Sequence, residues 1–351
     1  MKFDEEWFDD FQNRDHSSKV GKKHHRLPRF YMERWVNSRG MIKVIDRETG
    51  EFRLSKPINS LLEKDYYSFV TKSGDTSGVL EDLLTEIEGS ASEDLKALLR
   101  SPFREFPVPE RYRESLILFA TFQAARGHRN RRTNEFLTDF MTRMEFSLID
   151  SKNVEAFLRA RDIEPTAEAI EATLKFVGEL DEIEFVPHTN SALENMMNLL
   201  PKLFEAIQSR PMRVVNYGAP SIATCDEPLV LISYRERSLT GVGFLDADEI
   251  WLPLSPSHLL IFGSIDTSPT DQIWSDKSLN PAEVNGRVSW NSHQFIVTLP
   301  DSNFLGLEQV PGPQPIMEIS GGIQEWTSQS GQKRLAERSP RARFRSPSEW
   351  V

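Results

Sequence analysis

Cysteine is almost absent from this 351-residue sequence, and so are long uncharged apolar runs. The single cysteine, Cys225, excludes an internal disulfide and any zinc site built on several cysteines. No apolar run approaches the roughly 18–20 residues that cross a bilayer, and the acidic start, residues 1–6, lacks the apolar segment of a secretory signal. The sequence therefore predicts a cytoplasmic protein with no membrane partner.

Several catalytic signatures are also missing. The sequence has no Walker phosphate loop, no Rossmann glycine fingerprint, no Gly-x-Ser-x-Gly elbow, no His-Glu-x-x-His zinc motif and no EF-hand loop. The Glu-x-Lys pair that restriction-type nucleases place after a strand aspartate is absent too. Sequence chemistry alone therefore names no reaction, and every activity is a hypothesis.

Negative charge predominates, with a formal net charge of −11, but it is unevenly distributed. The net charge is +5 over residues 14–34, +4 over residues 126–132 and +4 over residues 333–351, so the remainder carries −24. This balance argues against a protein that binds nucleic acid over its whole surface. It predicts instead an anion-facing surface set into an acidic body. The alternative is that the basic segments are only solvated faces or flexible chain ends.

The spacing of apolar residues predicts an α+β fold. A short helix after Pro28 and a β-hairpin over residues 41–54 come first. Residues 78–208 have helical spacing, with one long helix or two abutting helices over residues 110–149. Residues 210–300 are rich in short strands separated by Pro and Ser turns, which predicts a mixed or antiparallel sheet.

The same spacing predicts several details within these regions. Short helices are expected at residues 167–178, 191–209 and 281–291. Four apolar side chains recur every four residues late in the long helix and predict core packing: Phe136, Phe140, Met144 and Leu148.

Composition divides the chain into three parts. We expect a single α+β domain over residues 23–325. An acidic N-terminal arm over residues 1–22 precedes it, and a basic tail over residues 326–351, rich in Ser, Gln, Gly, Arg and Pro, is predicted to be disordered.

Two histidines and several cations lie just before the first predicted helix, at residues 23–31. Imidazoles beside cations near a helix N-terminus form a corner that can bind phosphate or carboxylate. We expect a lowered pKa for His25, which would then be a neutral base, with Arg29 neutralising phosphate charge. The alternative is that His25 braces the helix. The His-His-x-x-Pro run also resembles the opening of HNH nucleases, but no further histidine follows before His128.

A polar stripe follows one face of the long predicted helix. Gln123, Arg126 and Asn130 are spaced by three and four residues, so they share that face. A guanidinium held there can bind a phosphate or carboxylate group with two parallel hydrogen bonds. An internal ion pair between Arg126 and a carboxylate of the body is the alternative.

Asp226 follows a predicted strand and precedes a Glu-Pro pair. Such a strand end is a place for a general base or a metal ligand, which makes a divalent metal the candidate cofactor. The same aspartate can instead open a turn by binding its own backbone. Its neighbour Cys225 has no activating group nearby in sequence, so we expect it to pack in the protein interior rather than to act as a nucleophile.

In order and spacing, these segments resemble the bacterial family catalogued as domain of unknown function 4238. Residues 25–32 match its His-Tyr-(Ile/Val)-Pro-x-x-Tyr-Leu motif, with Arg26 in place of the tyrosine. The other matching positions are residues 42–50, residues 65–67, Gln123, Arg126, residues 224–228, residues 252–256 and Asn285. Cys225 and Glu227 replace the Ser and Asn of the family's Thr-Ser-Asp-Asn-Pro strand end. The resemblance spans residues 23–300 and implies an architecture and a set of site residues, Asn285 among them, but no reaction.

Three functions remain open. The first is a nuclease-like or other phosphoester-acting effector of a defence or toxin type. In it His25 is the acid or base, Asp226 orients it or binds a metal, and Arg29 and Arg126 neutralise phosphate charge. The second is a non-catalytic sensor that binds a small anion, a nucleotide or a nucleic-acid end. The third is a buried structural network, with function residing in a partner interface.

Overall fold

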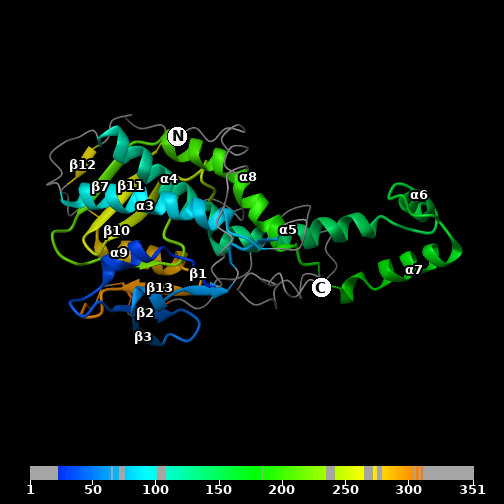
Figure 1. Ribbon diagram of the computed structural model, residues 1–351, viewed down its shortest axis with the longest axis horizontal. Helices are drawn as coiled ribbons and strands as arrows, with labels where there is room; N and C mark the ends of the chain where they lie inside the picture. The colour runs from blue at the N-terminus through cyan, green and yellow to red at the C-terminus, as the bar shows by residue number, and fades with distance from the viewer. Residues whose placement is uncertain are drawn as a thin grey trace.

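The computed structural model describes most of the chain (Figure 1). The described residues are 23–64, 66–70, 76–100, 108–183, 185–234, 242–264, 272–274, 279–302, 304, 306, 307 and 310. The predicted acidic arm, residues 1–22, and the predicted basic tail, residues 326–351, lie outside this set. Among the helices in it, none is long and apolar enough to cross a bilayer.

Short strands occur at both ends of the described chain. They are β1 (Lys23–His25), β2 (Ile42–Asp46), β3 (Phe52–Ser55), β4 (Leu62–Lys64), β5 (Phe69–Val70), β6 (Thr76–Ser77), β7 (Met212–Asn216), β8 (Thr224–Cys225), β9 (Val230–Ile232), β10 (Glu249–Ser255), β11 (His258–Phe262), β12 (Gln272–Trp274) and β13 (Phe295–Thr298).

Helices occupy the middle of the chain and a few positions elsewhere. The α-helices are α2 (Arg29–Met32), α3 (Val79–Arg100), α4 (Glu110–Arg126), α5 (His128–Ser147), α6 (Val154–Arg159), α7 (Ala167–Gly178), α8 (Thr189–Gln208) and α9 (Pro281–Asn291). The 3-10 helices are η1 (Glu33–Trp35), η2 (Pro57–Asn59) and η3 (Leu180–Glu182).

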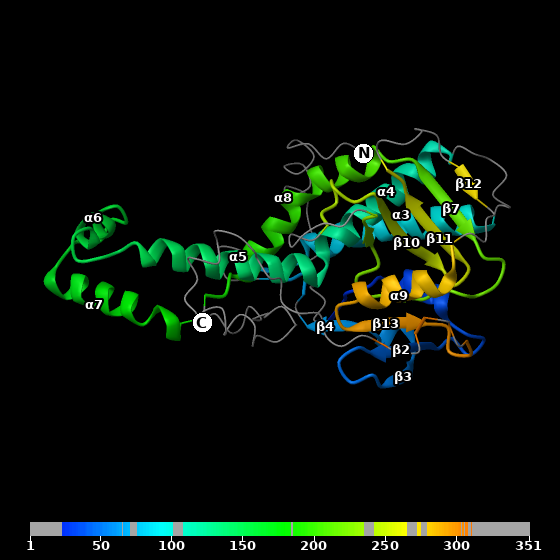
Figure 2. The same cartoon turned by 180° about the vertical axis from the view of Figure 1, so that it is seen from behind.

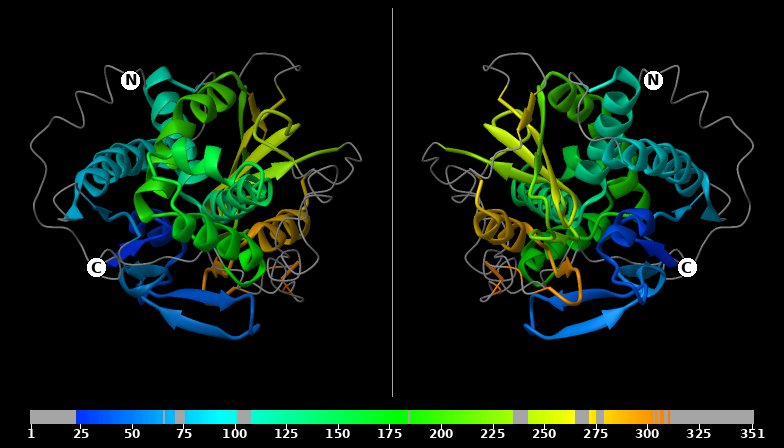
Figure 3. Two further views of the ribbon diagram at one scale, coloured as in Figure 1. Left: turned by 90° about the vertical axis from the view of Figure 1, so that its right-hand side faces the viewer. Right: turned by 90° about the vertical axis from the view of Figure 1, so that its left-hand side faces the viewer.

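The strands form two main sheets, which confirms the predicted α+β class. One sheet has the order β12-β7-β11-β10-β9, in which β12 pairs parallel to β7 and the other neighbours are antiparallel. The other has the order β3-β2-β13-β8 and is antiparallel throughout. The predicted hairpin is therefore confirmed as β2 and β3. The other edge of β2 pairs with β13, a strand near the C-terminal end of the described chain. Viewed along the long axis, this hairpin forms one edge of the body (Figure 3).

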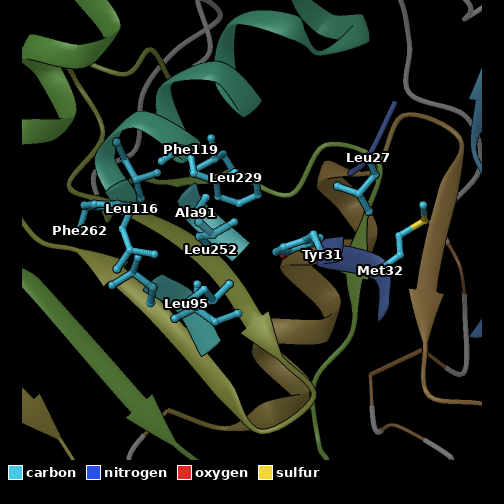
Figure 4. Close-up of a cluster of buried hydrophobic side chains, with 14 of the residues drawn as sticks. Leu27, Tyr31, Met32, Ala91, Leu95, Leu116, Phe119, Leu229, Leu252 and Phe262 are labelled. Carbon is cyan, nitrogen blue, oxygen red and sulfur yellow. The ribbon is translucent and has the colours of Figure 1, made fainter. Parts of the chain in front are cut away.

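The largest apolar cluster lies between the five-stranded sheet and the helices that cover it. Figure 4 shows side chains of α2, α3 and α4 converging on β10 and β11, with Leu95, Phe119, Leu252 and Phe262 among them. These four side chains are at most 1% exposed. Burial of a Leu or Phe side chain contributes about 1.5–3 kcal/mol, so this cluster is a main source of stability. It also holds the short α2 in place beneath the longer helices.

Two aromatic side chains join α2 and η1 to both sheets. The Tyr31 hydroxyl lies 3.0 Å from the Thr224 hydroxyl in β8 and donates to the Pro253 carbonyl in β10. The Trp35 indole donates to the Ile222 carbonyl at 3.1 Å. Because both rings are fully buried, their polar atoms need these partners, which link α2 and η1 to β8, to β10 and to the segment before β8. The view from behind shows α9 between the same two sheets (Figure 2).

The predicted long helix is two helices, and the second leaves the body. The chain breaks at Gly127 between α4 and α5, and α5 carries α6 and α7 at its far end (Figure 1). We call this part, from α5 to α7, the α5–α7 projection. Ile149, Val154 and Leu158 form a small apolar cluster of its own there. The predicted core stripe is therefore wrong at Leu148, which is 57% exposed, although Phe140 is buried; the side chain of Phe136 is not described.

Candidate functional site

The site is built on a two-stranded ribbon next to the body. Strand β1 pairs antiparallel with β4, so that His24 lies opposite Glu63 and His25 lies opposite Leu62. The Arg26 amide continues the ladder by donating to the Leu61 carbonyl at 2.9 Å. Because side chains alternate along a strand, His24 and Glu63 share one face while His25 points to the other.

A pocket of about 360 Å³ opens beside this ribbon. We call it the Arg26 pocket. Its walls come from four parts of the chain: the ribbon, the β3–η2 segment, the start of α5 and the start of β13. The lining residues are Arg26, Arg53, Asn59, Leu61, Leu62, Glu63, His128, Gln294 and Phe295.

Three charged or titratable side chains meet in the wall of the pocket. The His128 Nε2 atom lies 2.8 Å from Arg26 Nη1 and 3.1 Å from Glu63 Oε2. Arg26 Nε lies 3.6 Å from the same Glu63 oxygen, and Arg26 Nη2 donates to Gln294 Oε1 at 3.3 Å. Arg26 and His128 are both buried. One imidazole nitrogen therefore lies between a guanidinium and a carboxylate.

The protonation state of His128 decides which of these partners it binds. Arginine can only donate, so neutral His128 accepts from Arg26 at Nε2 and carries its proton on Nδ1. Protonated His128 donates from Nε2 to Glu63 instead. Burial and the charge of Arg26 lower the pKa of His128, although the hydrogen bond to Glu63 opposes this shift. The neutral form is thus favoured, and the imidazole can accept a proton.

Glu63 is held in its ionised form by the same neighbours. Burial acts to raise its pKa, but the hydrogen bond that it accepts from protonated His128 and the charges of His128, Arg26 and Arg131 outweigh burial, so the pKa lies below its usual value. The wall of the pocket therefore combines a fixed anion, a fixed cation and a group that exchanges a proton.

The turn before β13 positions the far wall of the pocket. Asp226 accepts hydrogen bonds from three consecutive backbone amides: His293 at 2.9 Å, Gln294 at 2.9 Å and Phe295 at 3.1 Å. The His293 ring then stacks on His128 with a centroid separation of 4.5 Å. Asp226 thus orients the residues that contact Arg26 and His128, rather than facing the pocket itself.

Glu227 fixes the start of α5, and hence His128, its first residue. Its Oε1 accepts from the Arg129 amide at 3.0 Å, which satisfies one of the free N–H groups at the start of that helix. A side chain at Gly127 would overlap the Glu227 carboxylate. Glycine at the helix break therefore allows a carboxylate from a distant segment to cap α5.

The two residues predicted around the first helix lie apart from the Arg26 pocket. His25 is half-buried and its Nδ1 lies 3.1 Å from the Ser60 carbonyl oxygen. Burial, aided by the charges of Arg29 and Arg126, lowers the pKa of His25, so the predicted direction is confirmed. Arg29 is 55% exposed and donates to Glu33 at 2.7 Å, within its own turn. Neither residue lines the pocket.

Two residues of the predicted helical stripe are buried, and none of the three lines the Arg26 pocket. Arg126 is 1% exposed and pairs with Glu88 at 2.7 Å, so the internal ion pair predicted as the alternative is present. Gln123 is also buried. Asn130 donates from its side chain to the Ala125 carbonyl at 2.8 Å, across the break between α4 and α5.

The remaining predicted residues have backbone partners. The Asn285 side chain accepts from the Ala223 amide at 2.8 Å and donates to the Ser221 carbonyl at 2.9 Å, which ties α9 to the segment before β8. In the part of the chain that the structure describes, no group of three or more His, Cys, Asp or Glu side chains could hold a metal ion. The role of Asp226 as a base or metal ligand stays a prediction. Cys225 is buried, as expected.

Most of the pocket cannot be predicted from the sequence. Arg26 stands out there only as a departure from a motif, and His128 only as the next histidine after His25. The acid-free basic segment 126–132 was the one signal near His128. Glu63 and Gln294 had no signal, because nothing local marks a single Glu or Gln whose partners lie far away in the chain.

Comparison with known proteins adds the family but no activity. The model of the family described as "Protein of unknown function (DUF4238)" matches residues 23–302, which is most of the chain. The chain therefore belongs to this family, as the motifs indicated. No curated protein and no solved structure gives a significant match.

Proposed function

We propose that this member of the DUF4238 family binds a small phosphate-bearing ligand in the Arg26 pocket. The observation that carries the proposal is the charge of its walls. Arg26 and Arg53 are always cationic, Glu63 is ionised and His128 is neutral, so the pocket has a net positive charge within an acidic protein. A cationic hollow of this kind concentrates anions.

The size and lining of the pocket support a small ligand over a duplex nucleic acid. Its 360 Å³ fall within the range typical of small-molecule sites, about 300–1,000 Å³. Both guanidinium groups lie against Phe295, Arg26 at 4.9 Å and Arg53 at 5.2 Å from the ring centroid. Arginines held against a ring lose less freedom when they bind, which favours tight pairing with phosphate oxygens.

Arg53 offers the test, because it is exposed and can be replaced without damage to the core. The wild type should be stabilised by one or more members of a panel of nucleoside mono-, di- and triphosphates in a thermal-shift assay. A ligand at 100 times its dissociation constant adds about 2.7 kcal/mol. Arg53→Gln should weaken the response at least tenfold, and Arg39→Gln, an exposed arginine outside the pocket, should not. Equal responses in both variants would contradict the proposal, and a wild type that responds to nothing would favour a structural role.

Phosphoester hydrolysis is the second candidate, favoured by the position of His128. Its Nε2 can take a proton in the wall of the pocket, and Arg26 can stabilise charge that develops on phosphate. If this activity exists, His128→Asn should abolish cleavage of RNA, DNA or a chromogenic phosphodiester, tested with and without divalent metal. His25→Asn should retain the activity. Loss in His25→Asn alone would instead assign the acid–base role to the histidine predicted from sequence.

A further inference from the structure

Arg126 is a buried arginine that uses only part of its hydrogen-bonding capacity. Its Nη1 donates to Glu88, but Nε and Nη2 have no hydrogen-bond acceptor among the residues that the structure describes. Nε and Nη2 form the side of the guanidinium that can bind two oxygens of one carboxylate or phosphate group. The edge suited to an oxyanion is therefore open.

Two other arginines, the buried Arg210 and the partly buried Arg143, have acceptors for all three side-chain nitrogens, whereas Arg126 has two nitrogens without one among the described residues. Nε, Nη1 and Nη2 of Arg210 donate to three backbone carbonyls at 3.1, 3.0 and 2.9 Å. Arg143 donates to both oxygens of Asp139 and to two backbone carbonyls. A buried donor left without an acceptor destabilises the folded protein, and a charged one does so more strongly. The incomplete pairing of Arg126 therefore requires an explanation.

Two further donors beside Arg126 also have no hydrogen-bond acceptor in the part of the chain that the structure describes. Gln123 Nε2 and the Tyr67 hydroxyl are buried and have no partner within the described part of the chain. Gln123 precedes Arg126 by three residues, so both lie on one face of α4. Burial raises the pKa of Tyr67 while the charge of nearby Arg126 opposes the rise, so the phenol keeps its proton and can donate. All these groups without a partner among the described residues are thus hydrogen-bond donors. A ligand that satisfies them must offer only acceptors, as a phosphate or carboxylate group does.

We propose that Arg126, Gln123 and Tyr67 form a second binding site, which takes the phosphate or carboxylate group of a small ligand. Glu88 occupies part of this site when no ligand is bound. Its side chain is 27% exposed, whereas that of Arg126 is 1% exposed, so Glu88 lies on the solvent side of the guanidinium. The ligand reaches Arg126 by displacing Glu88. None of the three donors lines the Arg26 pocket, so this site stands apart from the proposed function.

Glu88→Gln tests the competition between Glu88 and the ligand. The variant removes the competing charge and leaves the guanidinium in need of an anion. Inorganic phosphate should therefore raise the melting temperature of Glu88→Gln at least twice as much as that of the wild type, at matched ionic strength. Glu93→Gln, which removes an exposed carboxylate from the same helix, should respond like the wild type. Equal responses of Glu88→Gln and Glu93→Gln would overturn the proposal.

Gln123→Glu tests the open donors directly. The change preserves size and places a carboxylate one helical turn from Arg126, where it can accept from Nε and Nη2. In chloride buffer without phosphate this variant should melt at a higher temperature than the wild type, and its response to phosphate should be lost. A lower melting temperature in chloride would show that the donors do not require an anion, and would overturn the proposal.

Two further arms identify the ligand group and separate this site from the Arg26 pocket. Titration of Glu88→Gln with acetate in place of phosphate distinguishes a carboxylate ligand from a phosphate ligand, and no response to either contradicts the site. Adding Arg53→Gln to Glu88→Gln should leave the phosphate response intact. Loss of that response would move the binding to the Arg26 pocket and overturn the second site, whereas failure of the nucleotide panel would leave it standing.

Discussion

At the scale of single residues, Glu227 is both a helix cap and a buried carboxylate, and burial disfavours its charged form. Its carboxylate caps α5 by accepting from the Arg129 amide, yet it is buried beside Asp226. Burial, opposed by the charge of Arg129 and reinforced by Asp226, raises the pKa of Glu227 to about 7. Ionisation of this group near neutral pH therefore weakens the structure that positions His128.

The pH dependence of stability follows from this pKa. Because the pKa is higher in the folded protein than the ordinary 4.5 of the unfolded chain, ionisation favours unfolding. The contribution is fully present below pH 4.5, declines as the pH rises, and is lost above about 7. Between about pH 5.5 and pH 8 the wild type should lose about 2 kcal/mol of unfolding free energy that Glu227→Gln retains. Urea denaturation of both proteins at several pH values measures the difference; parallel curves would contradict the assignment.

Residue types in the polar network could be predicted, but most of their partners could not. The spacing of Gln123 and Arg126 predicted a shared helix face, which the structure shows to be buried, and an ion pair of Arg126 was one of two expectations. Tertiary packing decides the actual partners. Arg126 pairs with Glu88, and Arg26 donates to a glutamine 268 positions away in the chain. Asp226 could be placed at a strand end, but its three amide partners belong to a turn that no local pattern links to it.

At the scale of elements, two helices with predicted bounds begin directly after capping residues. α7 follows Thr166, whose side chain accepts from the Ala169 amide, and α9 follows Asn280 with Pro281 in its first turn. Both helices have the predicted bounds. The sequence does not decide between one helix and two here, because Glu227, which caps α5, is remote in sequence.

Gly127→Ala should show that the helix break depends on close approach. A Cβ at this position would overlap the Glu227 carboxylate, so the cap of α5 must shift. We expect a loss of about 1–3 kcal/mol in unfolding free energy, typical of overpacking at a tight contact. Gly89→Ala is the matched control, because nothing lies near its Cβ and alanine favours the interior of α3 by about 0.5–1 kcal/mol. Urea denaturation should give changes of opposite sign; a neutral Gly127→Ala would refute this account.

At the scale of the whole molecule, the α5–α7 projection has a small core separate from that of the body. Sequence predicted its helices but not its departure, because an apolar stripe on α5 has the same pattern whether it meets the body or another helix. Leu137, Met141 and Leu148 are 42–57% exposed along it. Order in the projection therefore depends on few side chains.

Leu158→Ala should loosen the projection without disturbing the body. Leu158 is 3% exposed within the small cluster, and removal of a buried leucine side chain costs about 2–5 kcal/mol. Amide hydrogen exchange should speed up at least tenfold in α6 and α7 and stay unchanged in α4. Ile163→Ala, on the same projection but 46% exposed, should leave exchange unchanged throughout. Faster exchange in α4 would show that the two cores are coupled.

The pairing of β2 with β13 dictates when the protein can finish folding during its synthesis. Val44 in β2 has Val297 as its partner, so a ribosome must translate nearly all of residues 23–302 before the edge of the hairpin is covered. Until then β2 offers unpaired backbone groups to neighbouring nascent chains. Truncated transcripts would therefore yield aggregates rather than partly folded fragments, and a chaperone that shields the emerging hairpin would raise the yield of folded protein.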